Sequence, residues 1–361
     1  MENLVSNTDS SISSGYQKWR LPSLDYLKAI CILFVIITHA ALVDRLRTEF
    51  LFPFWIDMAV PIFMIISGFV YSMSAERKHI TRIPDWFNLN IFKPKFMRIL
   101  TPFVIVYIIE AFMFLVYYQI TGTDYSLFML VWKFFAGGWG PGSYYVPILI
   151  QLLIAFPFLF YIFKRNPYYG TIGIITLNLL FEIVVHLFSI EVGIYRLLVF
   201  RYLTCVLLGM ILYFYRDRIK SSHICLSLLV GFTFILLVTY LGYKPILFTY
   251  WTGTSMLTAF YAFALVVMFL KVFETKSANI SQNAPNIIST IGKSSYHIYL
   301  TQMVYYCYAY VLLHRYLNNI LLEILLSIII CCCAGILFYI FEEKYISKIS
   351  ISRNPEVEKC I

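Results

Sequence analysis

Residues 23–39 read SLDYLKAICILFVIITH, an apolar run that contains the ionisable residues Asp25, Lys28 and His39. Its length suits a membrane-spanning helix, which needs about 20 mostly apolar residues. It is too long for the apolar core of a cleavable signal peptide, which has about 7–15 residues. Residues 126–136 are apolar but too short to span, which favours an interfacial or re-entrant position. The whole sequence predicts ten spans, at 24–44, 54–74, 98–119, 143–163, 169–188, 195–214, 222–242, 249–272, 292–313 and 319–340.

The composition indicates that lipid surrounds most of the chain. Hydrophobic residues make up 60% of the 361 residues and charged residues only 13%, whereas a soluble domain is about half apolar and about a quarter charged. The formal charge of +9 suggests a nucleic-acid partner. However, the basic residues lie in short loops between the apolar runs, where they orient membrane proteins. We therefore expect membrane lipids, and no nucleic acid, as partners.

The loop charges predict the orientation. With the N-terminus in the cytoplasm, twenty Lys and Arg residues fall in cytoplasmic segments and six on the opposite side, as the positive-inside rule requires. An even number of spans returns the C-terminus to the cytoplasm. The predicted fold is an all-α membrane protein, a ten-transmembrane-helix bundle with N- and C-termini cytoplasmic. Its parts are a cytoplasmic tail at 1–22, the membrane domain at 23–341 and a cytoplasmic tail at 342–361.

The eight cysteines point to no covalent or metal framework. Most lie inside the apolar runs, and none has the spacing of a CxxC motif or of a Cys/His zinc site. We expect neither disulfides nor a metal.

Lys28 and His39 share one face of the first helix. They are eleven residues apart, which is about 20° from three full turns and about 16 Å along the axis. Asp25 lies near the same face and can pair with Lys28. Ionisable groups inside a span are costly, and they indicate function by default. This face suits a reaction with one substrate arriving from each side. The alternative is that Lys28 snorkels to the interface and His39 hydrogen-bonds a neighbouring helix.

Five motifs occur in order along the spans. Asp25 and Lys28 precede His39 with ten residues between Lys28 and His39, and the second span contains PIFMIISGF at 61–69. The third span opens with KFMRILTP at 95–102, and the others are YYVPILIQ at 144–151 and GKSSYHIYL at 292–300. Together they resemble the acyltransferase-3 family of membrane-bound O-acyltransferases, which act mainly on sugars. The chain departs from that pattern with Lys95 in place of an Arg, and with Gln302 where relatives often have His.

The resemblance implies roles for the first-helix residues. The family transfers an acyl group, usually acetyl from acetyl-CoA, to a sugar hydroxyl. His39 is then the expected general base, with an acyl-histidine intermediate as an alternative. Lys28, Lys95 and Arg98 are expected to bind the donor phosphates, with Asp25 beside them. The alternative for the basic residues is a role in topology and in binding anionic lipid.

Other residues have two interpretations each. Glu110, mid-span in the third helix, either orients His39 or binds the acceptor hydroxyl, or else makes a structural hydrogen bond. The glycine-rich loop 137–147 contains Trp139, Tyr144 and Tyr145, which form either an acceptor site or a turn with an aromatic belt.

Two further polar positions lie in the middle of the chain. Glu182 and His186 are four residues apart on a predicted helix and should pair. Arg201 either snorkels to the outer interface or meets an acidic partner.

The resulting hypothesis is an integral-membrane O-acetyltransferase in the cytoplasmic membrane. It would move acetyl from cytoplasmic acetyl-CoA to a hydroxyl of a cell-surface polysaccharide or lipid-linked glycan, with no permanently bound cofactor. The alternatives are a glycan exporter or flippase of the same fold, and a sensor or scaffold without activity. The sequence leaves open the acceptor sugar, the choice of acetyl or succinyl, and the oligomeric state, for which a homodimer is one option.

Overall fold

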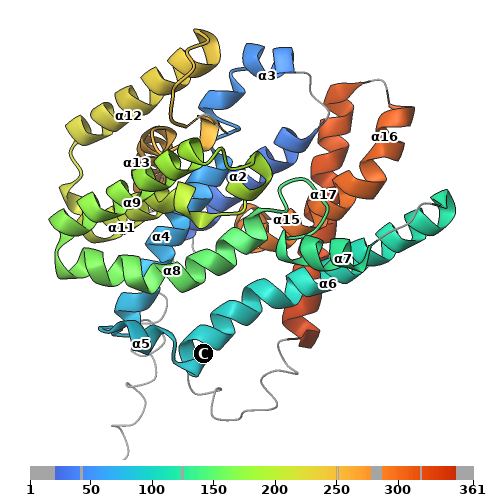
Figure 1. The fold of residues 1–361 in the computed structure, drawn as a ribbon, viewed down its shortest axis with the longest axis horizontal. Coiled ribbons are helices and arrows are strands. Elements are labelled where there is room, and N and C mark those ends of the chain that lie inside the picture. The colour runs from blue at the N-terminus through green and yellow to red at the C-terminus, as the bar shows by residue number, and fades with distance from the viewer. Residues whose placement is uncertain are drawn as a thin grey trace, which may run out of the picture.

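The computed structural model describes residues 21–40, 44–122, 126–248, 250, 252–277, 287–317 and 319–346, and these contain helices and no strand. Nine helical segments within these ranges are long and apolar enough to cross a membrane. The protein is therefore a multi-pass, all-helical membrane protein (Figure 1). The nine segments are Pro22–His39, Phe52–Arg77, Leu89–Thr121, Tyr145–Arg165, Pro167–Leu187, Val199–Arg218, Ser221–Tyr240, Met256–Phe273 and Ile320–Tyr345.

The predicted span at 292–313 is helical but interrupted. The chain forms α14 (Ile287–Lys293), α15 (Ser295–Val304), a π turn η6 (Tyr305–Ala309) and α16 (Tyr310–Tyr316). Buried polar residues such as His297 and Gln302 lie along this stretch, which makes it less apolar than the other nine. A tenth crossing and the side of the termini therefore remain predictions. Most of the predicted tails, 1–22 and 342–361, lie outside the described residues.

Helix α2 (Pro22–His39) runs through the middle of the bundle (Figure 1). It packs against α4 (Ala59–Arg77), α13 (Thr258–Ser277), α14, α15 and α17 (Ile320–Phe341). Its apolar residues recur at helical spacing and are buried, including Leu24, Leu27, Cys31, Ile32 and Ile36. Because helices surround α2, its ionisable face points into the bundle rather than towards lipid.

Two glycines allow α4 and α11 (Leu203–Tyr215) to pack closely. A Cβ on Gly68 would lie 2.3 Å from the Val206 carbonyl oxygen, and one on Gly209 would lie 2.1 Å from the Ile65 carbonyl oxygen. Small residues at helix interfaces are typical of membrane bundles. The Gly of the Ser-Gly-Phe motif at 67–69 thus has a packing role.

The peripheral helices present apolar surface outward. Residues such as Ile108 and Phe112 on α6 (Leu89–Thr121), and Leu229 on α12 (Ser221–Ile235), are exposed, as lipid-facing positions should be. Helix α7 (Leu127–Phe135) has nine residues and is too short to span. The remaining elements are α3 (Asp44–Glu49), η1 (Phe52–Phe54), α5 (Ile83–Trp86), α8 (Tyr145–Arg165), α9 (Pro167–Leu187), α10 (Val192–Tyr195), η2 (Val199–Tyr202), η3 (Arg216–Arg218), η4 (Leu236–Tyr240), η5 (Thr252–Thr254) and η7 (Glu342–Ile346).

Candidate active site

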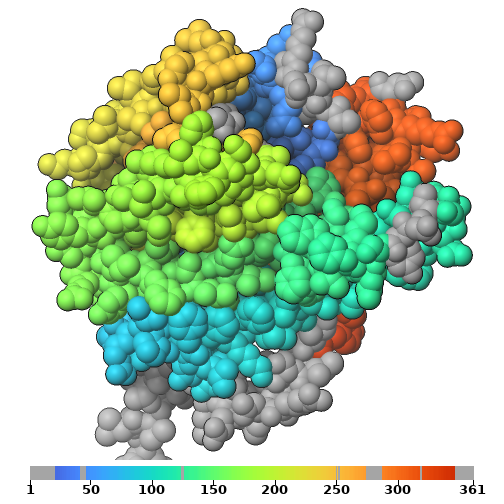
Figure 2. Space-filling view, viewed as in Figure 1, coloured from blue at the N-terminus to red at the C-terminus, as the bar shows by residue number. Residues whose placement is uncertain are grey.

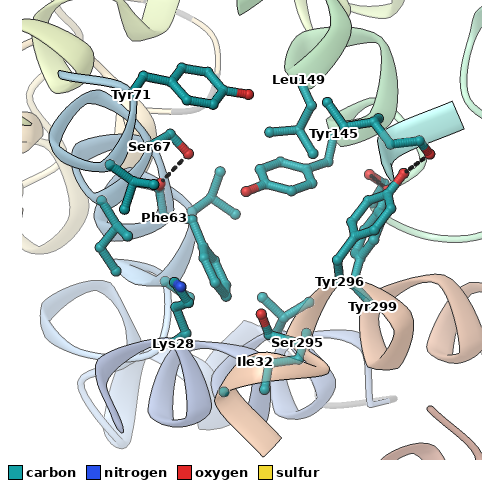
Figure 3. A pocket seen from close by; sticks show the side chains of 18 of the residues that line it. Lys28, Ile32, Phe63, Ser67, Tyr71, Tyr145, Leu149, Ser295, Tyr296 and Tyr299 are labelled. Carbon is teal, nitrogen blue, oxygen red and sulfur yellow. Dashed lines mark hydrogen bonds between the residues drawn. The ribbon is translucent and has the colours of Figure 1, made fainter. Parts of the chain in front are cut away.

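A cavity of about 1000 Å³ lies between α2, α4, α6, α8, α14 and α15. Lys28 and His39 both line it, together with aromatic residues from the surrounding helices. Figure 3 shows part of this wall, with Lys28 and Ile32 on one side and the tyrosines 145, 296 and 299 opposite. The face of α2 that contains the two ionisable residues therefore borders open space.

The two ends of the cavity can be identified from helix directions. Arg47 donates to the Thr38 carbonyl (3.1 Å) and pairs with Asp57 (2.9 Å), so the start of α4 lies beside the end of α2. The end of α4 therefore lies beside the start of α2. Basic residues from four helices line that second end, which we name the basic end: Lys28, Arg77, Lys78, Lys95, Arg98 and Lys293.

The cations of the basic end differ from one another in their contacts. The Lys95 ammonium donates to the Ser74 hydroxyl (2.6 Å) and lies over the Trp86 ring, 4.6 Å from its centroid. Lys28 pairs with buried Asp25 at 3.4 Å, as predicted. Arg98 is exposed and makes no ion pair or hydrogen bond within the described part of the chain. Its guanidinium is therefore open to the cavity.

His39 is the last residue of α2 and lies against the glycine-rich loop. A Cβ on Gly142, where φ is +84°, would lie 3.3 Å from His39 Nε2. The Tyr306 ring meets the imidazole edge-on with centroids 6.1 Å apart. No residue that the structure describes hydrogen-bonds the imidazole. Arg47 binds the carbonyl just before it, which satisfies one of the free acceptors at the helix end. The end of α2 is therefore held in place, while the ring nitrogens of the imidazole stay available.

Glu110 holds this loop instead of touching His39. It is fully buried on α6, does not line the cavity, and accepts a hydrogen bond from the Trp139 N–H (3.1 Å). A Cβ on Gly138, where φ is +108°, would lie 2.3 Å from the carboxylate, so only glycine fits there. Among the expected roles, the structural hydrogen bond is the one present.

The aromatic residues of the loop divide into two groups. Tyr144 and Tyr145 line the cavity, whereas Trp139 does not. The Trp139 indole packs between Tyr107 and Phe114, with centroids 5.4 and 4.8 Å away. The expected acceptor contact for Trp139 is therefore replaced by packing.

Two residues to which the sequence analysis gave no role also anchor the loop. The Tyr299 hydroxyl donates to the Gly142 carbonyl (2.9 Å), and the Gln302 amide donates to the Pro141 carbonyl (3.2 Å). Both belong to α15. Gln302 stands where relatives often have His, and here it is fully buried. The late motif could have indicated Tyr299, but nothing in the sequence indicated that it contacts the loop.

The structure decides both polar predictions in the middle of the chain, and it contradicts the first. Glu182 accepts a hydrogen bond from the Tyr195 hydroxyl (2.9 Å) and does not pair with His186. The segment after α9 folds back, so that its Tyr195 reaches Glu182 and takes the place of His186 as the partner. Of the two alternatives for Arg201, the snorkelling one is wrong: Arg201 is buried, donates to the Tyr202 hydroxyl (2.7 Å) and to Thr254, and lies near enough to the acidic Glu182 to interact with it electrostatically.

Fold and site together define a multi-pass membrane protein with an internal cavity that joins a cluster of cations to an unbonded imidazole. The chain belongs to the acyltransferase-3 family, because a family model described as an acyltransferase domain matches residues 21–340. The protein is therefore a membrane acyltransferase. No curated protein and no solved structure matches the chain.

Proposed function

We propose that the protein is an O-acetyltransferase of the cytoplasmic membrane that moves acetyl from acetyl-CoA to a hydroxyl of a cell-surface polysaccharide or lipid-linked glycan. The observation that supports this most is the single cavity lined by cations at one end and by the His39 imidazole at the other. Such a cavity can bind a long donor with a charged head and a reactive tail.

The donor enters at the basic end. Coenzyme A has several phosphate charges, and charge-assisted hydrogen bonds from Arg and Lys are the strongest way to bind them. Asp57 is the one acidic residue among the described residues that line the cavity, and it lies at the far end, paired with Arg47. The Arg98 guanidinium presents the planar fork that phosphate favours. The long arm of the coenzyme then extends along α2 towards His39.

The transfer takes place at His39. The imidazole takes the proton of the acceptor hydroxyl while that oxygen attacks the thioester carbonyl. The carbon–sulfur bond then breaks, and the leaving sulfur takes the proton back from the imidazolium. The products are the O-acetyl ester and free coenzyme A. In the covalent alternative, the imidazole attacks the thioester carbonyl, the carbon–sulfur bond breaks, and the coenzyme leaves as its thiol with the imidazole proton. The hydroxyl then attacks the acyl-imidazole, takes the acetyl group and gives its proton to the released imidazole.

The acceptor approaches from the His39 end. Tyr144 and Tyr145 line the cavity there, and aromatic rings stack well on the apolar faces of sugars. The loop residues Pro141 and Gly142 complete this wall. The acceptor hydroxyl reaches His39 between the loop and the tyrosines.

The test measures acetyl transfer in membranes with equal protein levels. Acetyl-CoA labelled in the acetyl group is supplied, and label is counted in the glycan fraction. His39→Ala should lower the transfer by about 10²- to 10⁴-fold, the usual contribution of a general base. His186→Ala, at an exposed position of α9 outside the cavity, is the control and should transfer normally. Full transfer by His39→Ala would refute the base role, and label that stays on the coenzyme in the wild type would indicate an exporter.

A further inference from the structure

A second cavity, of about 280 Å³, lies between α5 and the end of α8. Figure 2 shows the pale-blue residues around α5 lying directly against green α8 on the surface of the molecule. The charged residues at its rim are Arg82, Lys164 and Arg165. Its other lining residues are Ile80, Thr81, Ile83, Trp86, Pro157, Phe160 and Tyr161.

The rim has an excess of positive charge. Lys164 pairs with Glu76 at 2.6 Å, and Arg82 pairs with Asp85 at 3.3 Å. The Arg82 backbone N–H and then its guanidinium lower the pKa of Asp85, so this carboxyl stays ionised. Arg165 is exposed and has no ion pair or hydrogen bond within the described ranges. Because the two pairs are solvent-exposed and weak, all three cations can turn towards an anion.

The rest of the cavity is apolar and continues into the lipid-facing surface. Trp86, Ile80 and Phe160 are buried and form its floor. On the same turns of α8, Phe158 and Ile162 directly follow the cavity-lining Pro157 and Tyr161, and they are 46% and 49% exposed. A water-soluble anion would gain nothing from this apolar extension. A ligand with an anionic head and a hydrocarbon chain would match both parts.

We propose that this cavity binds an anionic phospholipid, with the headgroup phosphate at Arg82 and Arg165 and one acyl chain along α8. Basic pockets between membrane helices are suited to anionic headgroups. The position also places a lipid next to the donor region, because Trp86 borders this cavity and also supports Lys95 of the basic end. A bound lipid would therefore lie beside Trp86, over whose buried indole the Lys95 ammonium rests.

The test uses the purified protein in neutral detergent. Its thermal unfolding midpoint is measured with phosphatidylglycerol, with phosphatidylcholine of the same chains, and with inorganic phosphate. Phosphatidylglycerol should raise the midpoint by several degrees, because a ligand that binds only the folded state stabilises it. Phosphatidylcholine and inorganic phosphate should leave it unchanged. An equal rise with inorganic phosphate would overturn the lipid assignment in favour of a soluble anion.

The variant R82Q/R165Q should lose most of this rise. The matched control is R218Q/K220Q, which removes two positive charges between α11 and α12, outside both cavities. Native mass spectrometry counts the phosphatidylglycerol molecules retained by each protein, and it remains informative if a variant is less stable. An equal rise and equal retention in R82Q/R165Q and in the control would overturn the proposal.

Discussion

The two ends of the main cavity are built on different principles. At the basic end, six cations from four helices share one space, and exposed Arg98 can move to its ligand. At the other end a single imidazole lies beside the loop: a Cβ on Gly142 would lie 3.3 Å from it, and Arg47, Tyr299 and Gln302 hold the neighbouring carbonyls. Binding of charge tolerates redundancy and motion, whereas proton transfer needs one group at one position. Substitutions should therefore weaken binding gradually at the first end and lower turnover sharply at the second.

The largest effect after loss of His39 itself is expected at the glycine loop. Gly142→Ala places a methyl group at positive φ, directly against the imidazole. The turnover number should fall by up to roughly 100-fold, because the methyl group both strains the loop at this φ and presses on the imidazole, and a displacement of about 1 Å at a reacting group has an effect of that size. The control is Gly173→Ala on α9, where a Cβ would meet nothing within 4 Å. Equal turnover in both alanine variants would show that the loop is unimportant for His39.

A smaller and different effect is expected at the basic end. Lys95→Gln with Arg98→Gln removes two of its six cations. The KM for acetyl-CoA should rise about 10-fold or more, since each hydrogen bond to a charged group contributes about 1.5–3 kcal/mol. The turnover number at saturating donor should change little. The control R218Q/K220Q removes the same amount of charge outside the cavity and should keep the wild-type KM. A similar rise of the KM in both double variants would mean that the overall charge of the protein, and not this site, attracts the donor.

The smallest effect is expected at Glu110, a positioning residue. Glu110→Ala removes the acceptor of the Trp139 N–H, so the loop loosens and the turnover number should fall about 10-fold with an unchanged donor KM. Glu110→Gln keeps an acceptor oxygen and should restore most of the turnover. If Glu110→Gln is as poor as Glu110→Ala, the carboxylate itself takes part in the chemistry.

Features set by helical periodicity were predictable from sequence. The eleven-residue spacing placed Lys28 and His39 on one face of α2, and the three-residue spacing gave the Asp25–Lys28 pair. Nine of the ten apolar runs are helices of spanning length. The shared face, the ion pair and the spanning lengths each depend only on residues within one helix.

Features that depend on how separate segments meet were not predictable. Glu110 and Trp139 are 29 residues apart, and the loop turns the Trp139 backbone towards the carboxylate and its indole away from the cavity. The prediction of a Glu182–His186 pair was wrong because the chain after α9 brings the Tyr195 hydroxyl to Glu182 instead. Helical spacing alone contains no information about either loop.

The most direct test of the central claim separates donor binding from transfer in one variant. His39→Gln keeps a polar side chain of similar size at the far end of the cavity and leaves the basic end untouched. Labelled acetyl-CoA should bind purified His39→Gln with the Kd of the wild type, while acetyl transfer falls by about 10²-fold or more. Transfer at the wild-type rate would contradict the account, and so would a donor Kd weakened as much as in Lys95→Gln/Arg98→Gln.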